Sequence, residues 1–261
     1  MPVAEVAVML PTSPEEAAQA FGDGTGITVL AGGTIVVPEL TYRRLAPEKV
    51  LMLARSGLDR ITRDGGAVTI GAAAPVSALE SLDEPLATAA RYVGDVEVRA
   101  QATVGGNLCA GPGRETPIGD LQAPLIALGA RVRSAGSGGE RTEPLEDFLA
   151  GDPRRRLVLD VSYDDKPREA GYAAMWRPHT HHYTILAVAA ARADGELRLA
   201  ATGAAPHAVR LSSVEASGNA ADALNDVNPQ DDALASAWYR RKILPRLVEQ
   251  ALANLTSQGA A

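Results

Sequence analysis

Short apolar runs, separated by polar and glycine-rich breaks, fill the first 165 residues of the chain. Runs of this length that are rich in Val, Ile and Leu are typical of β-strands. They predict strands over residues 5–10, 27–30, 49–54 and 154–163, and a hairpin over 61–73 that turns at Asp64-Gly65-Gly66. The pattern therefore favours a protein with several short strands.

Helix signals lie between these runs. Ser13, Pro14 and Glu16 occupy the N-cap, first and third positions expected of a capped helix. Residues 35–44 predict a short helix or an extended turn, 74–82 and 84–93 predict short helices, and 118–136 predicts a helix that leads into a strand. This mixture of hairpins and helices departs from the regular alternation of a doubly wound parallel sheet.

The pattern changes after residue 166. Two long extended runs, 181–193 and 196–205, meet at Asp194-Gly195 and predict an antiparallel meander. A short helix over 210–216 and a closing helix over 231–255, kinked at Pro245, complete the chain. We therefore predict two domains, 1–165 and 166–261.

Composition narrows the function classes. The net charge is −7, from 25 basic and 32 acidic residues without long runs, so no nucleic-acid partner is expected. No segment approaches the roughly 18 apolar residues of a spanning helix, and the N-terminal stretch lacks the basic start of a signal peptide. The expectation is a cytoplasmic protein with no membrane span. The single cysteine, Cys109, excludes an iron–sulfur cluster or a Cys-rich zinc site built by this chain alone.

Two glycine pairs carry the main candidate chemistry: AGGT at residues 31–34 and TVGGNLC at 103–109. Glycine lets main-chain N–H groups approach a ligand closely, so such loops can form a nest for phosphate without Lys or Arg. Ordinary turns explain the same pairs equally well. Neither a P-loop nor a dinucleotide fingerprint after a strand is present.

Together with PIGDLQAPLIALGARV at 117–132 and the closing helix, these motifs resemble the FAD-binding subunits of molybdenum hydroxylases. The resemblance implies an α+β fold: a PCMH-type FAD-binding domain of two α+β subdomains, then a small α+β domain with a three-stranded antiparallel sheet and helices. It also implies FAD contacts, both glycine loops on the pyrophosphate and the aspartate near the ribityl chain, at Ala31, Gly32, Gly33, Thr34, Ile35, Thr103, Val104, Gly105, Gly106, Asn107 and Asp120.

The function implied by the resemblance is electron relay. A molybdopterin-binding large subunit and a [2Fe–2S] small subunit would be partners, and FAD would pass electrons to NAD+ or oxygen. Neither a catalytic side chain nor a metal ligand is then expected in this chain. Two alternatives stay open: a stand-alone FAD-dependent oxidase or dehydrogenase of the same fold, and a flavin-free structural subunit.

Several positions depart from the family pattern. Ile35 follows AGGT where Asp or Ser is usual, and Ala174 stands where Lys is common. The segment 108–116 contains about four extra residues, a difference typical of variable loops. The segment between Ala216 and Pro229 is short and is expected to lack a helix. These differences leave the access to the flavin and the electron acceptor open.

Other candidate residues have two interpretations each. His179, His181 and His182 could bind a metal but fit surface histidines better. Cys109 could lie beside the flavin or be a small buried thiol. The triplet 154–156 could be a solvated turn or meet an acidic partner. Trp176 and Tyr183 could face the flavin or pack in the core.

Overall fold

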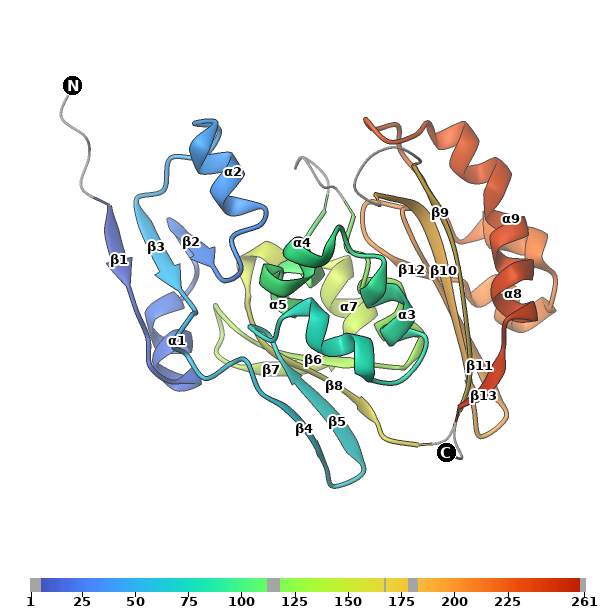
Figure 1. Cartoon of the computed structure of the whole chain (residues 1–261), viewed down its shortest axis with the longest axis horizontal. Helices are drawn as coiled ribbons and strands as arrows, with labels where there is room; N and C mark the ends of the chain where they lie inside the picture. The colour runs from blue at the N-terminus through green and yellow to red at the C-terminus, as the bar shows by residue number, and fades with distance from the viewer. Residues whose placement is uncertain (1–5, 112–117, 167, 178–182, 259–261) are drawn as a thin grey trace.

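The computed structural model describes residues 6–111, 118–166, 168–177 and 183–258 of the chain (Figure 1). Three sheets lie along the long axis of the molecule: a three-stranded parallel sheet, a five-stranded central sheet and a five-stranded C-terminal sheet. Helices fill the space between the central and C-terminal sheets, and two further helices cover the outside of the latter (Figure 1). The α+β class expected from the sequence is confirmed.

The N-terminal sheet has the strand order β1-β3-β2. Its elements are β1 (Ala7–Met9), α1 (Pro14–Phe21), β2 (Ile27–Leu30), α2 (Val36–Thr41) and β3 (Lys49–Met52). The predicted cap of α1 is present, because Ser13 Oγ accepts from the Glu16 amide at 3.2 Å. Ala17 and Phe21 then bury one face of α1 beside Leu51 of β3. The strand and helix patterns thus act together to form this layer.

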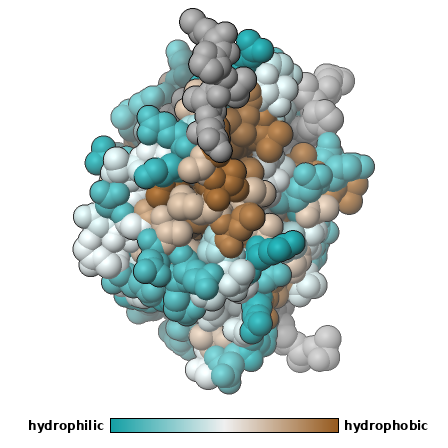
Figure 2. Space-filling model, turned by 90° about the vertical axis from the view of Figure 1, so that its left-hand side faces the viewer, coloured by the Kyte–Doolittle hydropathy of each residue, from teal (hydrophilic) through white to brown (hydrophobic). Residues whose placement is uncertain are grey.

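The outer side of this sheet carries exposed apolar side chains. Val8 is 54% exposed, Leu10 55% and Val37 of α2 47%. Figure 2 views the molecule from this side and shows a contiguous apolar area there. Parallel sheets are usually covered on both faces, whereas these apolar side chains of the N-terminal layer are exposed.

The central sheet is antiparallel, with the order β4-β5-β8-β6-β7. Its strands are β4 (Ile61–Asp64), β5 (Ala67–Gly71), β6 (Arg131–Ala135), β7 (Arg141–Pro144) and β8 (Leu157–Asp164). The predicted hairpin is confirmed: Asp64 pairs with Ala67 across Gly65 and Gly66, which both adopt positive φ. Two glycines satisfy this tight turn at no steric cost.

Short helices cover one face of the central sheet. They are η1 (Val76–Ser81), α3 (Leu86–Arg91), α4 (Val96–Gln101), α5 (Val104–Leu108), α6 (Gln122–Ala127), α7 (Leu145–Ala150) and η2 (Pro153–Arg155). All six residues of α6 are buried, and Ala123, Leu125, Ile126 and Ala127 among them join one core with alanines of the C-terminal sheet. The central helical layer therefore binds the two antiparallel sheets to each other.

The C-terminal sheet has the order β12-β11-β10-β9-β13. The implied three-stranded sheet is its centre, β9 (Arg168–Trp176), β10 (Thr184–Ala193) and β11 (Glu196–Thr202), and short edge strands β12 (Val209–Arg210) and β13 (Thr256–Gln258) extend it. Outside it lie α8 (Ser212–Ser217), η3 (Ala220–Asn225) and α9 (Ala237–Ala253). The helical turn η3 occupies the segment expected to lack a helix.

The closing helix begins at Ala237 and not at Asp231 as predicted. Asp232 accepts hydrogen bonds from the amides of residues 234 and 235, Asp231 accepts one from the amide of Ala237, and these bonds hold the stretch in a turn. Aspartate side chains compete with helical hydrogen bonds in this way. Pro245 lies inside the helix, as expected.

Candidate functional site

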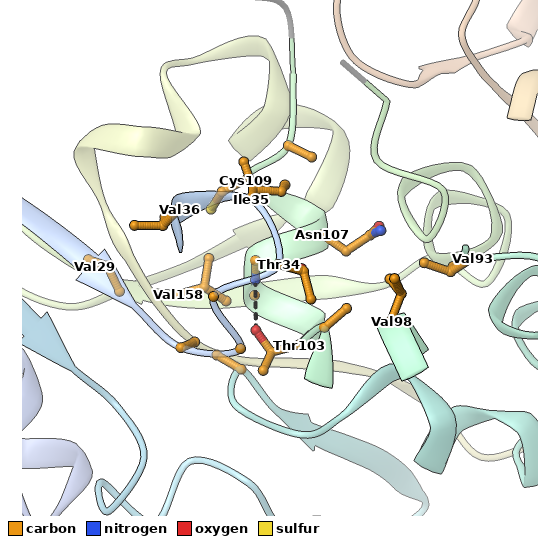
Figure 3. A pocket seen from close by; sticks show the side chains of 18 of the residues that line it. Val29, Thr34, Ile35, Val36, Val93, Val98, Thr103, Asn107, Cys109 and Val158 are labelled. Carbon is orange, nitrogen blue, oxygen red and sulfur yellow. Dashed lines mark hydrogen bonds between the residues drawn. The ribbon is translucent and has the colours of Figure 1, made fainter. Parts of the chain in front are cut away.

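A cavity of about 450 Å³ lies where the three sheets meet. Its walls come from the β2–α2 loop, the α4–α5 segment, the start of β8, the start of β10 and the turn before α9 (Figure 3). This volume is within the range of small-molecule and cofactor sites. Every predicted site residue except Val104 lines it; Val104 is fully buried in the core.

The first glycine loop presents bare main chain to the cavity. Gly33 has a φ of 76°, which a residue with a side chain rarely adopts. A Cβ on Gly32 would lie 1.8 Å from the Gln101 carbonyl oxygen, so this glycine allows the loop to touch the end of α4. The amides of residues 32–35 donate no hydrogen bond to any described residue. They are therefore available to an acceptor in the cavity.

The second glycine pair differs from the predicted nest. Residues 104–108 form the short helix α5, with Thr103 as its N-cap: Thr103 Oγ1 accepts from the Gly106 amide at 3.3 Å (Figure 3). The Val104 and Gly105 amides donate to Ala74 and Ala72 carbonyls at 3.0 and 2.8 Å. These N–H groups are already satisfied by the protein, so only the first loop offers unpaired amides.

The two glycines of α5 have different uses. A Cβ on Gly105 would lie 2.9 Å from the Cβ of Ala72, the residue that follows β5. Gly105 therefore lets α5 pack closely against Ala72. Gly106 is exposed, and its added Cβ would meet only Thr103 Oγ1, at 3.1 Å. Gly106 thus keeps space free on the cavity side and does not relieve a contact in the core.

Three polar side chains meet at another part of the wall. Asn107 Oδ1 accepts from the Leu121 amide at 2.9 Å, which fixes Asn107 next to Asp120. Burial raises the pKa of Asp120 to about 6, and the facing Thr184 and Asn107 side chains oppose part of this rise. Thr184 is 3% exposed, and its hydroxyl has no hydrogen-bond partner among the described side chains and main chain. A buried polar atom in this state fits a site that a ligand completes.

The comparison with known proteins decides the family. A model described as the FAD binding domain in molybdopterin dehydrogenase matches residues 4–162 and includes both glycine loops and Asp120. The chain belongs to this family. FAD is therefore its cofactor, and it is an FAD-binding subunit of the molybdenum hydroxylase type with a redox role.

Relatives of this FAD-binding family match over most of their length. The chain is 30% identical to the protein YgfM of Escherichia coli, covering 88% of each, and 27% identical to the carbon monoxide dehydrogenase medium chain of Hydrogenophaga pseudoflava, covering 93% of this chain and 94% of that one. A solved carbon monoxide dehydrogenase from H. pseudoflava that lacks the Mo-pyranopterin moiety superposes with a TM-score of 0.81, covering 98% of this chain and 100% of that chain at 24% identity. The last match supports the fold.

Two arginines of the 154–156 triplet line the cavity: Arg154 lies in η2, and Arg156 immediately precedes β8. Arg156 is not a solvated side chain: its guanidinium donates to the carbonyls of Ser134, Ser137 and Gly139 at 2.8–3.2 Å. Desolvation lowers its pKa. Arg154 is exposed. Arg156 therefore orders the β6–β7 turn, whereas Arg154 is 55% exposed and its Nε lies 4.0 Å from the Asp152 carboxylate.

Cys109 lines the same cavity and is partly buried. Its Sγ lies 3.5 Å from the Pro153 carbonyl oxygen, and burial raises its pKa to about 12. The thiol is therefore protonated near neutral pH and is a poor nucleophile. The site contains a packed sulfur and not a reactive one.

The two candidate aromatic residues have different environments. Tyr183 lines the cavity, whereas Trp176 packs against Tyr92 with ring centroids 4.4 Å apart. His179, His181 and His182, like residues 112–116 of the 108–116 loop, lie outside the described residues. Over the part of the chain that the structure describes, no group of three potential metal ligands occurs and no helix is long and apolar enough to cross a membrane.

Sequence reasoning missed several wall residues. They are Val93, Val98, Val158, Thr184 and Leu234. None belongs to a motif, and the last two come from the C-terminal part of the chain. Local sequence patterns do not report contacts between distant segments, so they could not place these residues beside the glycine loops.

Proposed function

We propose that this chain is the electron-transfer subunit of a molybdopterin-dependent hydroxylase or dehydrogenase complex, in which FAD passes electrons from the iron–sulfur clusters of a partner to NAD+ or oxygen. The observation that carries the proposal is a cavity whose first glycine loop has main-chain amides without a hydrogen-bond partner among the described residues. When bound, FAD supplies the redox chemistry, and the protein binds and orients it.

The residues that line the cavity define the contacts that we propose with FAD. The amides of residues 32–35 would donate to the pyrophosphate, with Ala31, Thr103, Gly105 and Gly106 shaping the same end of the cavity. The Thr184 hydroxyl, Asn107 and Asp120 would meet polar groups of the cofactor elsewhere. Val104 supports this site from the core.

The partner proposal has its own support. The chain has one cysteine, and that residue lines the cavity, so the clusters must be held by another chain. Its relatives include medium chains of dehydrogenases. We further propose that residues 1–165 form the FAD-binding domain and 166–261 a C-terminal domain that closes the cavity.

The first test is an absorbance spectrum of the purified chain, with identification of whatever acid releases. We expect FAD in near-equimolar amount. A colourless protein that does not bind added FAD would contradict the proposal and favour the flavin-free structural alternative. FAD binding without co-purifying iron and molybdenum chains, after expression in the native host, would favour the stand-alone flavoprotein.

A variant sharpens this test. Gly106→Val fills cavity-side space and is expected to abolish FAD retention, whereas the surrounding core has no contact for it to disturb. Gly151→Val is a matched control, because Gly151 is exposed, has a φ of −82°, and a Cβ there comes no closer than 3.4 Å to another atom and lies outside the cavity wall. Full FAD retention by Gly106→Val would contradict close approach of the cofactor to α5.

A further inference from the structure

The turn before α9 supplies a wall of the cavity. Leu234 lies in this turn, and together with Tyr183 and Thr184 it makes up the contribution of the described residues after 166. Leu234 also packs on the core beneath α9. The position of this wall therefore depends on what holds residues 231–236.

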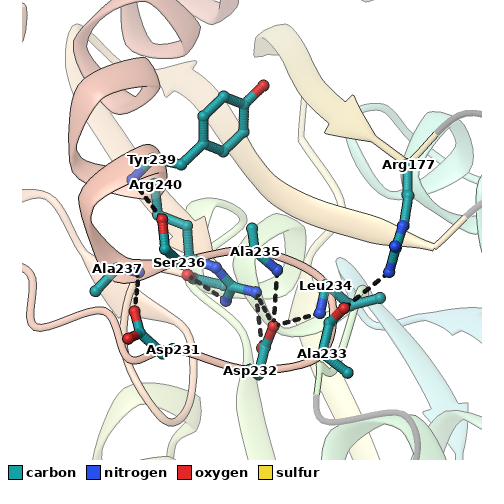
Figure 4. Close-up of polar contacts among 11 residues, drawn as sticks. Arg177, Asp231, Asp232, Ala233, Leu234, Ala235, Ser236, Ala237, Tyr239 and Arg240 are labelled. Atoms are coloured by element: carbon teal, nitrogen blue, oxygen red, sulfur yellow. Dashed lines mark hydrogen bonds and ion pairs between the residues drawn. The ribbon is translucent and has the colours of Figure 1, made fainter.

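Local hydrogen bonds shape the turn (Figure 4). Asp232 Oδ1 accepts from the Leu234 and Ala235 amides at 2.8 and 3.1 Å. Ser236 Oγ accepts from the Tyr239 amide at 3.2 Å and caps α9. Such Asx and N-cap bonds set the shape of the turn, but they do not fix where it lies on the rest of the fold.

Arg240 fixes that location. It is 4% exposed, and its Nη2 lies 2.7 Å from both carboxylate oxygens of Asp232 (Figure 4). Its Nη1 donates to the Gly203 carbonyl at 3.0 Å. On the exposed side, Arg177 Nη1 donates to the Ala233 carbonyl at 2.8 Å. An unpaired buried guanidinium is strongly destabilising, so Arg240 and Asp232 stay paired and keep one relative position.

The contact with Gly203 reaches a second part of the wall. Gly203 follows Thr202 at the end of β11, and the buried Thr202 hydroxyl donates to the Gly119 carbonyl at 2.9 Å. Gly119 precedes Asp120, which lines the cavity. Arg240 thus supports both the Leu234 turn and the strand end that holds Gly119, although it does not line the cavity itself.

We propose that Arg240, through Asp232 and Gly203, is a positioning residue of the cofactor site, which holds Leu234 and the Gly119–Asp120 segment where they close on FAD. This rests on the proposed function for the identity of the ligand. Loss of the Arg240 interactions with Asp232 and Gly203 lets the Leu234 turn and the Gly119–Asp120 segment move, and this weakens FAD binding. No contact between Arg240 and FAD is involved.

The test uses full-length Arg240→Lys, Asp232→Asn and Leu234→Ala, with Arg210→Lys as the matched control. Arg210 Nε lies 3.1 and 2.9 Å from the two carboxylate oxygens of Glu215, in the same part of the chain, but neither residue lines the cavity. Circular dichroism checks folding, and titration of the FAD-free proteins gives the Kd. We expect about a tenfold rise in Kd for Arg240→Lys, Asp232→Asn and Leu234→Ala, and no change for the control.

A double variant separates positioning from a general loss of stability. If Arg240 acts through Leu234, Leu234→Ala in the Arg240→Lys background adds less to the Kd than it does alone. Full additivity, or a Kd for Arg240→Lys equal to that of Arg210→Lys, overturns the inference and leaves FAD binding by the native chain intact.

A second readout does not need FAD. Hydrogen exchange of the FAD-free protein is expected to be faster at the amides of residues 233–237 in Arg240→Lys than in the native chain or in Arg210→Lys. Failure of the native chain to bind FAD would overturn the proposed function. The exchange rates would then decide the positioning role: unchanged exchange overturns it, and faster exchange supports it.

Discussion

Asp120→Asn is expected to stabilise the FAD-free protein above pH 6 and to leave its stability unchanged in acid. Burial raises the pKa of Asp120 from 3.8 to about 6 in the folded chain, so the folded state binds a proton more tightly than the unfolded state does. The contribution of Asp120 to stability is therefore fully present below about pH 4 and is lost as the pH rises through about 6. A shift of 2.2 units, 6 minus 3.8, corresponds to about 3 kcal/mol at most.

The assay is urea unfolding of native and variant chains between about pH 4 and pH 8, where the linear extrapolation gives the free energy of unfolding. The variant should gain up to about 3 kcal/mol relative to the native chain over this interval, with the slope concentrated between the folded and unfolded pKa values. Asp59→Asn, at an exposed position, is the control. A difference in unfolding free energy that does not change with pH would refute the assignment of a buried, protonatable Asp120.

Three further outcomes are expected. Gly32→Ala should lower the free energy of unfolding by about 1–3 kcal/mol or more in urea titrations, because its Cβ would lie 1.8 Å from the Gln101 carbonyl oxygen, whereas Gly106→Ala should change it little. Cys109 should react with a thiol reagent far more slowly in the native chain than in urea, since burial raises its pKa to about 12, and equal rates would contradict this. Thr184→Val should weaken FAD binding about tenfold in a titration, because the buried hydroxyl beside Asp120 makes no hydrogen bond of normal geometry to a described residue and is free to bond the ligand, and unchanged binding would contradict this.

Much of the fold follows from local sequence signals. Ser13 caps α1, Gly65 and Gly66 make the hairpin turn, and Asp194-Gly195 joins β10 to β11. Each of these depends on chemistry within a few residues, so the pattern alone predicts it. The first glycine loop also follows from its motif, because strand β2 ends directly before it.

The second glycine segment shows where local reasoning ends. Two adjacent glycines disfavour a helix, so the pattern predicted a turn. Packing of Gly105 against Ala72 and the Thr103 cap outweigh that preference and produce α5. Thr184 and Leu234 could not be assigned to the site for a related reason: they reach it through contacts between segments far apart in sequence.

The difference between the two glycine loops decides how the protein behaves without cofactor. The amides of residues 104–107 are bonded within the protein, so this half of the site keeps its shape as a rigid template. The amides of residues 32–35 have no hydrogen-bond partner among the described residues, and Gly32 within this loop touches the end of α4. We therefore expect that release of FAD loosens this loop before it loosens α5, and that FAD binding orders the loop last.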